Sequence, residues 1–518
     1  MPFTRRSALL ASGLGLLAPA PAFGKAKPAS SPIREPTEKH LSDLDALVVD
    51  VMKKTGVPGM SVAVVSPDRA LYLKGFGMRR ADAADRVDPD TVFQIASLSK
   101  PLSTTVVAGL VGDGVVSWDQ PIERTLPGFA MSDPWVTCEI TLRDMFCHRS
   151  GLPDHAGDLV EDIGYDRDEI IRRLRYIKPN TSFRTHYAYN NMGFSAAGFA
   201  AAKAARKSWE DVCDERLYRP LGMTSASSRH VDFIAQKNRA FGHVRRGDRW
   251  VVGREQRNAD AQAPAGGASA SARDMATWVR LQLRDGVFDG REIVKPEALA
   301  ETHFPQIATG PAHDPMRGPT FYGLGWDIDY GGPARQRWSH SGGFALGAAT
   351  CAYVMPAERF GIVVLSNSAP IGAPETICRS FLDLVLTGKI ERDWLALFGG
   401  AFAEMAISTY GRDADYAKPP ASAPARAPRS TYVGYYRNEL YGPIGVVETA
   451  EGLSLTLGPA PTSYPMRHYS GDIFTFQPAG ENASGLSPVR FSRNGDEKAA
   501  SVVIDYFNGN GQGVFMRS

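Results

Sequence analysis

Cysteine is scarce in this sequence, which has five cysteines among 518 residues. Their number is odd, and no two of them form a C-x-x-C pair. A protein held together by a disulfide framework needs a denser, paired set, so the sequence excludes that class, while a single bridge stays open. We interpret the thiols as small buried apolar side chains. They are Cys138, Cys147, Cys213, Cys351 and Cys378.

A charge excess is also absent. The 58 Lys and Arg residues nearly balance the 56 Asp and Glu residues, and the net charge is +2. Proteins that bind nucleic acid or acidic membranes usually carry a basic surplus, so the sequence predicts neither partner. It contains no H-E-x-x-H motif and no cluster of metal-ligating residue types. We therefore expect no metal and no other cofactor.

The N-terminus lacks an apolar run long enough for a membrane span. The run from Ala8 to Leu17 falls short of the ~20 residues that a spanning helix needs. A twin arginine, Arg5-Arg6, precedes it, and the small residues Ala18 to Ala22 follow it. This order is typical of a bacterial export signal of the twin-arginine type, with a membrane anchor as the alternative. We expect residues 1–24 to be removed, which leaves a periplasmic or secreted chain without a stable membrane span.

The length of the chain allows two or three domains. A helical pattern from His40 to Lys54 is followed by two strand patterns, Gly59 to Val65 and Ala70 to Gly77, around a turn. An edge hairpin is the simplest interpretation of those two strands. From Lys418 the composition becomes rich in Pro and Ala, which is typical of a linker.

Beyond Thr431 short strand patterns alternate with Gly, Pro and Asn turns over about ninety residues, which predicts a small antiparallel barrel. The predicted domains are therefore a hydrolase-sized region at 40–390, a helical segment and linker at 391–429, and a barrel at 430–518. The expected strands of the barrel are 446–448, 453–457, 474–476, 489–491, 501–507 and 514–516.

The most informative short motif is the S-x-x-K pair Ser97 and Lys100. Residues three apart on a helix share one face, so the amine lies beside the hydroxyl. Serine needs a neighbouring base to act as a nucleophile, and a lysine can serve when burial lowers its pKa. Pro101 fits a first helical turn, which places Ser97 at a helix N-terminus with a free N–H for an oxyanion. Read alone, the motif also fits an ordinary helix start with a solvated lysine.

A second cluster contains Tyr189 and Asn191, in a loop just before the helical pattern Phe194 to Ala202. A phenol near a lysine can pass a proton and act as part of a base, and an Asn amide can donate to a substrate carbonyl. The alternative is an ordinary surface turn. Further upstream, His148 follows a helix that begins at Thr141, and we interpret it as satisfying carbonyls at the helix end rather than as catalytic.

The third cluster is His340-Ser341-Gly342-Gly343, which precedes two apolar segments with the pattern of a hairpin. A glycine pair at a strand edge lets a ligand approach the main chain, whose N–H groups could complete an oxyanion hole. A glycine-rich turn with an incidental histidine is the alternative interpretation of this segment.

In this order, Ser97-Leu98-Ser99-Lys100, Tyr189-Asn190-Asn191 and His340-Ser341-Gly342 resemble the motifs of the serine β-lactamase-like superfamily. Within it the match is to the branch that contains class C β-lactamases, D,D-peptidases, D-aminopeptidases and family VIII esterases. The resemblance covers Leu41 to Leu386. The tail, with Tyr432-Val433-Gly434-Tyr435-Tyr436, resembles the lipocalin-like domain appended to some members.

The resemblance implies an α+β fold: an antiparallel sheet flanked by helices and an all-helical lobe, followed here by the barrel. It implies that Ser97 is the nucleophile and that Lys100 and Tyr189 form its base system. Asn191, His340, Ser341 and Gly342 would contact substrate, and the backbone N–H groups of Ser97 and Gly343 would form the oxyanion hole. It implies no metal.

One departure bears on the substrate. Penicillin-recognising members usually have Lys-Thr-Gly where this chain has His340-Ser341-Gly342. We therefore expect a serine hydrolase that forms an acyl-enzyme on an ester, an amide or a peptide containing a D-amino acid. A β-lactamase or D,D-peptidase of cell-wall metabolism is the first alternative, and a non-catalytic binding protein is the second. The expected partner is a small-molecule or peptide substrate, and the sequence predicts no oligomeric state.

Overall fold

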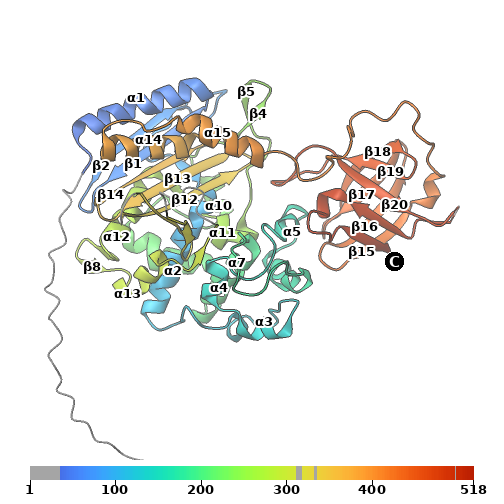
Figure 1. The fold of residues 1–518 in the computed structure, drawn as a ribbon, viewed down its shortest axis with the longest axis horizontal. Helices are drawn as coiled ribbons and strands as arrows, with labels where there is room; N and C mark the ends of the chain where they lie inside the picture. Colours follow the sequence, from blue (N-terminus) through green and yellow to red (C-terminus); the bar gives the residue numbers. More distant parts are fainter. Residues whose placement is uncertain (1–34, 311–317, 332–334, 496) are drawn as a thin grey trace, which may run out of the picture. The chain divides into compact units, whose positions relative to one another are not determined.

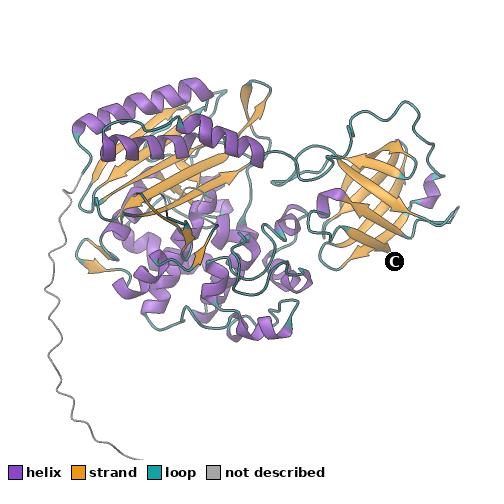
Figure 2. Cartoon of the chain, in the orientation of Figure 1, coloured by secondary structure: helices purple, strands orange, loops and turns teal. Residues whose placement is uncertain are grey.

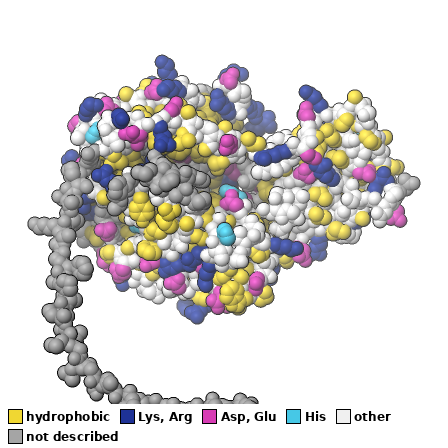
Figure 3. Space-filling view, in the orientation of Figure 1, with side chains coloured by type: hydrophobic (Ala, Val, Ile, Leu, Met, Phe, Trp, Pro, Cys, Tyr) yellow, Lys and Arg dark blue, Asp and Glu magenta, His cyan; other side chains and the backbone are white. Residues whose placement is uncertain are grey.

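A computed structural model describes residues 35–310, 318–331, 335–495 and 497–518. The predicted export signal lies outside these residues. The order of elements is a helix, a hairpin, a long helical region, the rest of a large sheet, two helices and a barrel (Figure 1). None of the described helices is both long enough and apolar enough to span a bilayer. On the face shown in Figure 3, Lys and Arg side chains are interspersed with Asp and Glu, as the balanced composition leads one to expect.

The large sheet has eight strands in the order β2-β1-β14-β13-β12-β11-β10-β9, and each neighbouring pair is antiparallel. The predicted hairpin is confirmed, with β1 at Gly59–Val65 and β2 at Ala70–Gly77, and β2 lies at the edge. Every residue of β1 is buried, whereas most residues of β2 are only partly buried, as expected for an edge strand. The other strands are β9 (Ile307–Ala308), β10 (Phe321–Tyr322), β11 (Asp327–Tyr330), β12 (Gln336–Phe344), β13 (Ala348–Met355) and β14 (Phe360–Ser366).

Helices cover both faces of this sheet (Figure 1). On one face lie α1 (Glu38–Thr55), α14 (Ala373–Thr387) and α15 (Trp394–Met405), and α12 (Ala272–Leu283) lies against β1 and β14 on the other. The sequence explains α1 well. Thr37 forms a capping box at its start, Gly56 ends it at a positive φ of 69°, and its buried residues recur at helical spacing.

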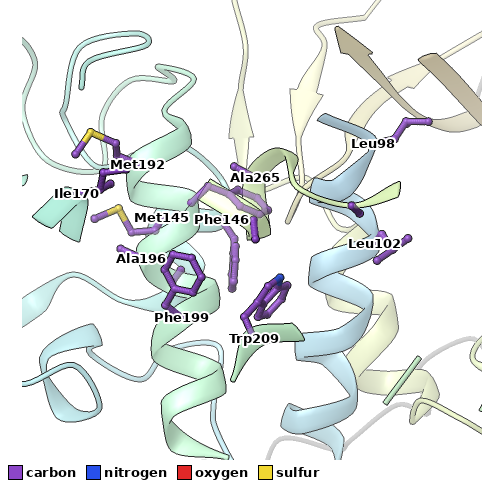
Figure 4. Close-up of a cluster of buried hydrophobic side chains, with 14 of the residues drawn as sticks. Leu98, Leu102, Met145, Phe146, Ile170, Met192, Ala196, Phe199, Trp209 and Ala265 are labelled. Carbon is purple, nitrogen blue, oxygen red and sulfur yellow. The ribbon is translucent and has the colours of Figure 1, made fainter. Parts of the chain in front are cut away.

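A helical lobe adjoins the sheet, and its core is built around two buried helices, α2 (Ser99–Gly112) and α7 (Asn191–Ala204). Figure 4 shows Phe146 and Trp209 between these two helices, with Leu102 on α2 and Ala196 on α7. Helices that are apolar all round must be enclosed, and α2 is buried from Ser99 to Leu110. The remaining helices are α3 (Pro134–Glu139), α4 (Leu142–Phe146), α5 (Asp158–Asp162), α6 (Arg167–Arg173), α8 (Trp209–Cys213), α9 (Arg219–Leu221), α10 (His230–Ala235), α11 (Ala263–Gly266) and α13 (Pro296–Ala300).

Three short antiparallel pairs complete this part of the chain. The pair β3–β6 matters for the site because β3 leads directly to Ser97. The pairs are β3 (Val92–Gln94) with β6 (Ser269–Ser271), β4 (His243–Arg246) with β5 (Arg249–Val252), and β7 (Val287–Phe288) with β8 (Arg291–Glu292). Figure 2 shows strands and helices segregated into a sheet and a lobe, which confirms the predicted α+β class.

The C-terminal region forms a closed barrel of eight antiparallel strands, because β22 pairs with β15. Closure removes the exposed edges that an open sheet would have. The sequence predicts six of these strands but not β15 or β18. In β18 exposed polar residues and a proline break the alternation of apolar residues on which a strand prediction rests. The strands are β15 (Gly434–Asn438), β16 (Gly442–Thr449), β17 (Gly452–Leu457), β18 (Thr462–Ser470), β19 (Ile473–Phe476), β20 (Ser487–Ser492), β21 (Ser501–Ile504) and β22 (Val514–Arg517).

All five cysteines carry free thiols in the structure, and four of them are buried. Only Cys138 is exposed. Burial raises the pKa of Cys147 and of Cys213 to about 12, so these thiols stay protonated at neutral pH and act as apolar packing groups.

Candidate active site

Ser97 lies in a single 3-10 turn, Ala96–Leu98, between β3 and α2. Ala96 adopts a positive φ of 48°, an uncommon conformation for a residue with a side chain, so the chain turns sharply just before the serine. Lys100 stands on the first turn of α2, and its Nζ lies 3.1 Å from Ser97 Oγ. The two residues meet as the S-x-x-K spacing predicts.

Lys100 is completely buried. Its Nζ contacts three oxygens: Ser97 Oγ, Asn191 Oδ1 at 2.7 Å and the Ala265 carbonyl oxygen at 2.9 Å. Burial lowers the pKa of Lys100 to about 7, and the positive charge of Arg257 acts in the same direction. A substantial fraction of the amine is therefore neutral near pH 7.

The geometry assigns a direction to the lone pair of the neutral amine. The oxygens of Asn191 and Ala265 can only accept, so they take the two remaining N–H groups. The lone pair is then left facing the hydroxyl of Ser97, which is the one neighbour of the three that can donate a proton.

Tyr189 lies beside both Ser97 and Lys100, and it hydrogen-bonds to the Ser97 side chain. Its ring lies under the Lys100 amine, with Nζ 4.5 Å from the ring centroid. Burial raises the pKa of Tyr189 well above its ordinary value, although the bond to Ser97 opposes the shift. The phenol therefore keeps its proton at neutral pH, so between the two residues of the predicted base system Lys100 is the one that can accept a proton directly.

Asn191 is the first residue of α7, and Asn190 caps that helix by accepting from the Gly193 N–H. The Asn191 amide is engaged at both ends, since its Nδ2 donates to Asp158 Oδ2 at 2.8 Å and its Oδ1 faces Lys100. Asp158 Oδ2 also lies 2.9 Å from His155 Nδ1. The sequence interpretation did not single out Asp158 or His155.

His148 does not have the role that the sequence predicts for it. Its ring does not serve carbonyls at the helix end. Instead Nδ1 accepts a hydrogen bond from the Asn190 N–H at 3.0 Å, so the ring supports the loop that carries Tyr189. Burial lowers the pKa of His148 well below its ordinary value, which keeps the ring neutral for this role. Its ring also packs against Tyr189, with centroids 4.5 Å apart.

His340 stands on β12 at the point where pairing with β11 stops, because the last paired residue of β12 toward β11 is Ser339. From His340 onward no strand of the described residues pairs with that edge of β12, which we call its open edge. His340 Nδ1 lies 2.6 Å from the Ser341 carbonyl oxygen, so Nδ1 carries the proton, and Nε2 accepts from the Tyr322 hydroxyl at 2.9 Å. Burial, together with the charge of Lys100, lowers the pKa of His340 to about 3. The ring is neutral.

Gly342 lies directly against the serine turn. A Cβ at this position would stand 2.8 Å from Ser97 N and 2.5 Å from the Ile95 carbonyl oxygen. Only a residue without a side chain lets β12 approach so closely. Gly343, the next residue, is exposed.

The Ser341 side chain points to the other face of the sheet. Its hydroxyl contacts Cys351 Sγ at 3.6 Å and Glu375 of α14. Successive residues of a strand face opposite sides, so the His340 side chain points toward Tyr189 and Tyr322 while the Ser341 side chain cannot. The structure thus brings together all the predicted site residues except that hydroxyl, and only the main chain of Ser341 can meet a ligand.

A buried charge cluster adjoins the end of β12. Arg257 lies 4.7 Å above the Phe344 ring and pairs with Glu161 at 2.7 Å and Glu481 at 3.5 Å. Glu481, between β19 and β20, also accepts from the Ala345 N–H at 2.6 Å. Burial raises the pKa of each glutamate to about 7. No pattern in the sequence indicates this cluster, because its members are far apart in the chain.

A serine beside a buried lysine, between an antiparallel sheet and a helical lobe, is the arrangement that an active-site serine hydrolase requires. The family model described as Beta-lactamase matches residues 44–386, and the chain belongs to that family. A second model, a domain of unknown function named DUF3471, matches residues 418–513.

Relatives and solved structures agree with this assignment. The unguisins hydrolase ungD' of Aspergillus campestris is 31% identical over 350 residues, which are 64% of this chain and 63% of that protein, so the match spans less than two thirds of its length. The unguisins hydrolase ungD of Aspergillus violaceofuscus is 23% identical over 87% of this chain and 85% of that protein. Protein flp of Staphylococcus aureus is 22% identical over 48% and 50% of the two chains. The octameric penicillin-binding protein homologue from Pyrococcus abyssi shares the fold with a TM-score of 0.59 at 19% identity, over 92% of this chain and all of that one.

Proposed function

We propose that this chain is an exported serine hydrolase in which Ser97 is acylated. The observation that carries the proposal is the 3.1 Å contact between Nζ of the fully buried Lys100 and Oγ of the partly exposed Ser97. A lysine with a pKa of about 7 is matched to a general base at neutral pH, which is the property that the attack requires.

The proposed first half-reaction begins when neutral Lys100 takes the Ser97 hydroxyl proton while Oγ bonds to the substrate carbonyl carbon. The main-chain N–H groups of Ser97 and Gly343 donate to the resulting oxyanion. When the tetrahedral species collapses, the bond to the leaving group breaks, and the ammonium proton reaches that group through the Tyr189 hydroxyl. Lys100 is neutral again, and the acyl group remains on Ser97. In the second half-reaction a water molecule gives a proton to Lys100 while its oxygen bonds to the acyl carbon. The bond between that carbon and Ser97 Oγ then breaks, Oγ takes the proton back from Lys100, and the carboxylic acid product leaves.

The remaining predicted residues would bind and align the substrate. The second N–H of the Asn191 amide and the open edge of β12 from His340 to Gly343 are the groups we assign to substrate contact. The neutral His340 ring supports an ester, an amide or a peptide containing a D-amino acid over a substrate with a carboxylate near the scissile bond. The relatives named as unguisins hydrolases support hydrolysis. A β-lactamase or D,D-peptidase is the alternative, which the name of the family supports.

A labelling experiment tests acylation directly. A fluorophosphonate probe should modify Ser97 of the full chain, and mass spectrometry should locate the adduct on that residue. Ser97→Ala should abolish labelling, whereas Ser99→Ala serves as the matched control two residues away. Labelling that persists in Ser97→Ala would overturn the proposal, and so would a chain that no probe modifies.

The substrate class needs a separate panel. Chromogenic esters, D-aminoacyl anilides and a cephalosporin should be compared by kcat/KM, with turnover of an ester or an anilide expected to exceed that of the cephalosporin. Export also has its own test: Arg5→Lys with Arg6→Lys should retain the protein in the cytoplasm of a bacterial host that exports the unaltered chain. Equal export of both would contradict the twin-arginine route.

A further inference from the structure

Asp158 touches the proposed catalytic machinery without being part of it. It is the first residue of the short helix α5 and is 5% exposed. Its Oδ2 accepts from Asn191 Nδ2 at 2.8 Å, and Asn191 Oδ1 in turn lies 2.7 Å from Lys100 Nζ. A continuous chain of polar contacts thus runs from the carboxylate to the serine.

We propose that Asp158 is a positioning residue for the hydrolase reaction: it locks the Asn191 amide with its oxygen toward Lys100, and this directs the Lys100 lone pair at Ser97. The inference rests on the proposed function of Ser97 and Lys100. It adds a residue and a role to the three predicted motifs.

An amide between two partners can take two orientations. With Oδ1 toward Lys100, the amide accepts from the amine. Rotated by half a turn, the amide would point Nδ2 at Lys100 Nζ, so that N–H groups of both residues would face each other. A carboxylate has only acceptors, so Asp158 can pair with the Nδ2 end of Asn191 and with no other. The Asp158 carboxylate, which can only accept, therefore determines the orientation of the Asn191 amide.

The consequence reaches the nucleophile. If Asn191 presented an N–H instead of an oxygen, the amine could accept from that N–H, and its lone pair would be turned away from Ser97. The base would remain in place but would be misdirected, and small errors in the direction of a catalytic group cost about a hundredfold in rate. Asp158 thus acts on Lys100 through one intervening amide.

His155 contacts both Asp158 and the main chain of Tyr189. Its Nδ1 lies 2.9 Å from Asp158 Oδ2, and its main-chain N–H donates to the Tyr189 carbonyl oxygen at 2.7 Å. Burial alone would lower the pKa of His155, but its hydrogen bond to Asp158 and the charge of that residue raise it above its ordinary value. His155 has a positive φ of 53°, so a constrained turn presents its ring to Asp158 and its main chain to Tyr189.

Asp158 also acts on Lys100 through its charge, because the carboxylate favours the ammonium form and raises the pKa of Lys100 against the effect of burial. Removing the Asp158 charge should therefore change the pH dependence of the reaction, which the loss of a purely structural residue would not do. Other groups that face Lys100 are Arg257, Asp327, His148, His155 and His340. The titratable groups facing Asp158 are His155, Lys100, Glu161, Tyr189, Arg257 and Tyr441.

The test is the second-order rate of fluorophosphonate labelling of the full chain from pH 5 to pH 9. Asp158→Asn keeps the size of the side chain but lets it donate or accept, so both orientations of Asn191 become possible. We expect the plateau rate to fall about ten- to a hundredfold. We also expect the rising limb to move to lower pH, because the charge that favours the ammonium is gone. Asp166→Asn makes the same chemical change at the N-cap of α6, where the amide oxygen can still accept from the Glu169 N–H. It is the matched control and should keep the wild-type profile.

A double-mutant cycle separates positioning from a general loss of structure. If Asp158 acts through Asn191, then Asn191→Ala with Asp158→Asn should label no more slowly than Asn191→Ala alone. Near-UV circular dichroism of each variant reports whether it is folded. A wild-type rate and pH profile for Asp158→Asn would overturn the inference, as would additive effects in the cycle. Failure of the proposed function itself looks different, since the wild-type chain would then not be labelled at Ser97.

Discussion

Gly342 of β12 packs so closely on the main chain of Ser97 that a Cβ on the glycine would stand 2.8 Å from the serine nitrogen. Gly342 and Ser97 are 245 positions apart in the chain, and they can approach this closely because residue 342 has no side chain. The same contact aligns the open edge of β12 with the serine, which is the arrangement that an oxyanion hole shared by the two segments needs.

Gly342→Ala should therefore disturb the site more than the size of a methyl group suggests. We expect the free energy of unfolding to fall by about 1–3 kcal/mol, because the added carbon meets main-chain atoms that cannot move aside. Fluorophosphonate labelling of Ser97 should fall sharply as β12 shifts. Gly400→Ala in α15, where an added Cβ meets nothing within 4 Å, is the control. Urea unfolding of both variants checks the claim, and equal stability and labelling would contradict it.

The pH dependence of labelling should follow Lys100. Because the neutral amine is the base, the rate should rise with pH and reach half its maximum near pH 7, the pKa to which burial lowers Lys100. Lys100→Met should lower the rate by about a hundredfold or more. Lys100→Arg should do the same, since a guanidinium stays protonated.

The same group makes folding stability depend on pH. The folded-state pKa of Lys100 is lowered, so between about pH 7 and the ordinary value of 10.5 the unfolded chain binds more protons than the folded one. The contribution of Lys100 to stability therefore rises with pH across this window and is flat below it. Lys100→Met should remove that rise in urea unfolding measured at several pH values. If the free energy of unfolding of Lys100→Met rises with pH as steeply as that of the wild type, the pKa of Lys100 is not lowered in the folded protein.

His340 should bias the enzyme against substrates that carry a carboxylate near the scissile bond. Its pKa of about 3 leaves the ring neutral at pH 7.5, so it offers a hydrogen bond without charge. We expect kcat/KM for a neutral ester to exceed that for a carboxylate-bearing cephalosporin. His340→Lys should shift the ratio toward the cephalosporin by about ten- to a hundredfold, the worth of a charge-assisted hydrogen bond. His340→Gln is the neutral control. Wild-type preference for the cephalosporin would favour the β-lactamase alternative.

The segment from Lys418 to Arg429 should be the first site of limited proteolysis. Most of its side chains are exposed, and it is rich in Pro and Ala. We expect proteinase K to cut there before it opens the region around Ser97 or the barrel. Mass spectrometry of the first fragments checks the position. Early cuts inside 40–390 with an intact segment would count against a separate C-terminal domain.

The sequence by itself determined the features that depend on neighbours along the chain. The S-x-x-K spacing placed Lys100 beside Ser97 because one helical turn brings them together. The hairpin β1–β2 and the start of a helix at Thr141 follow from alternation and from cap chemistry that act within a few residues. That three distant segments, around Ser97, Tyr189 and His340, form one site was implied only by the resemblance of their motifs to those of a known family.

Tertiary structure alone decided the contacts that give those residues their chemistry. Asp158 reaches Asn191, 33 positions away, and Glu481 reaches Ala345 across 136 positions, and neither pairing leaves a periodic trace in the sequence. The direction in which a side chain points depends on strand pairing, which is why the Ser341 hydroxyl faces α14 while His340 faces Tyr189. The lowered pKa of Lys100 likewise exists only once folding has removed the amine from water, because desolvation is a property of the packed interior and not of any local motif.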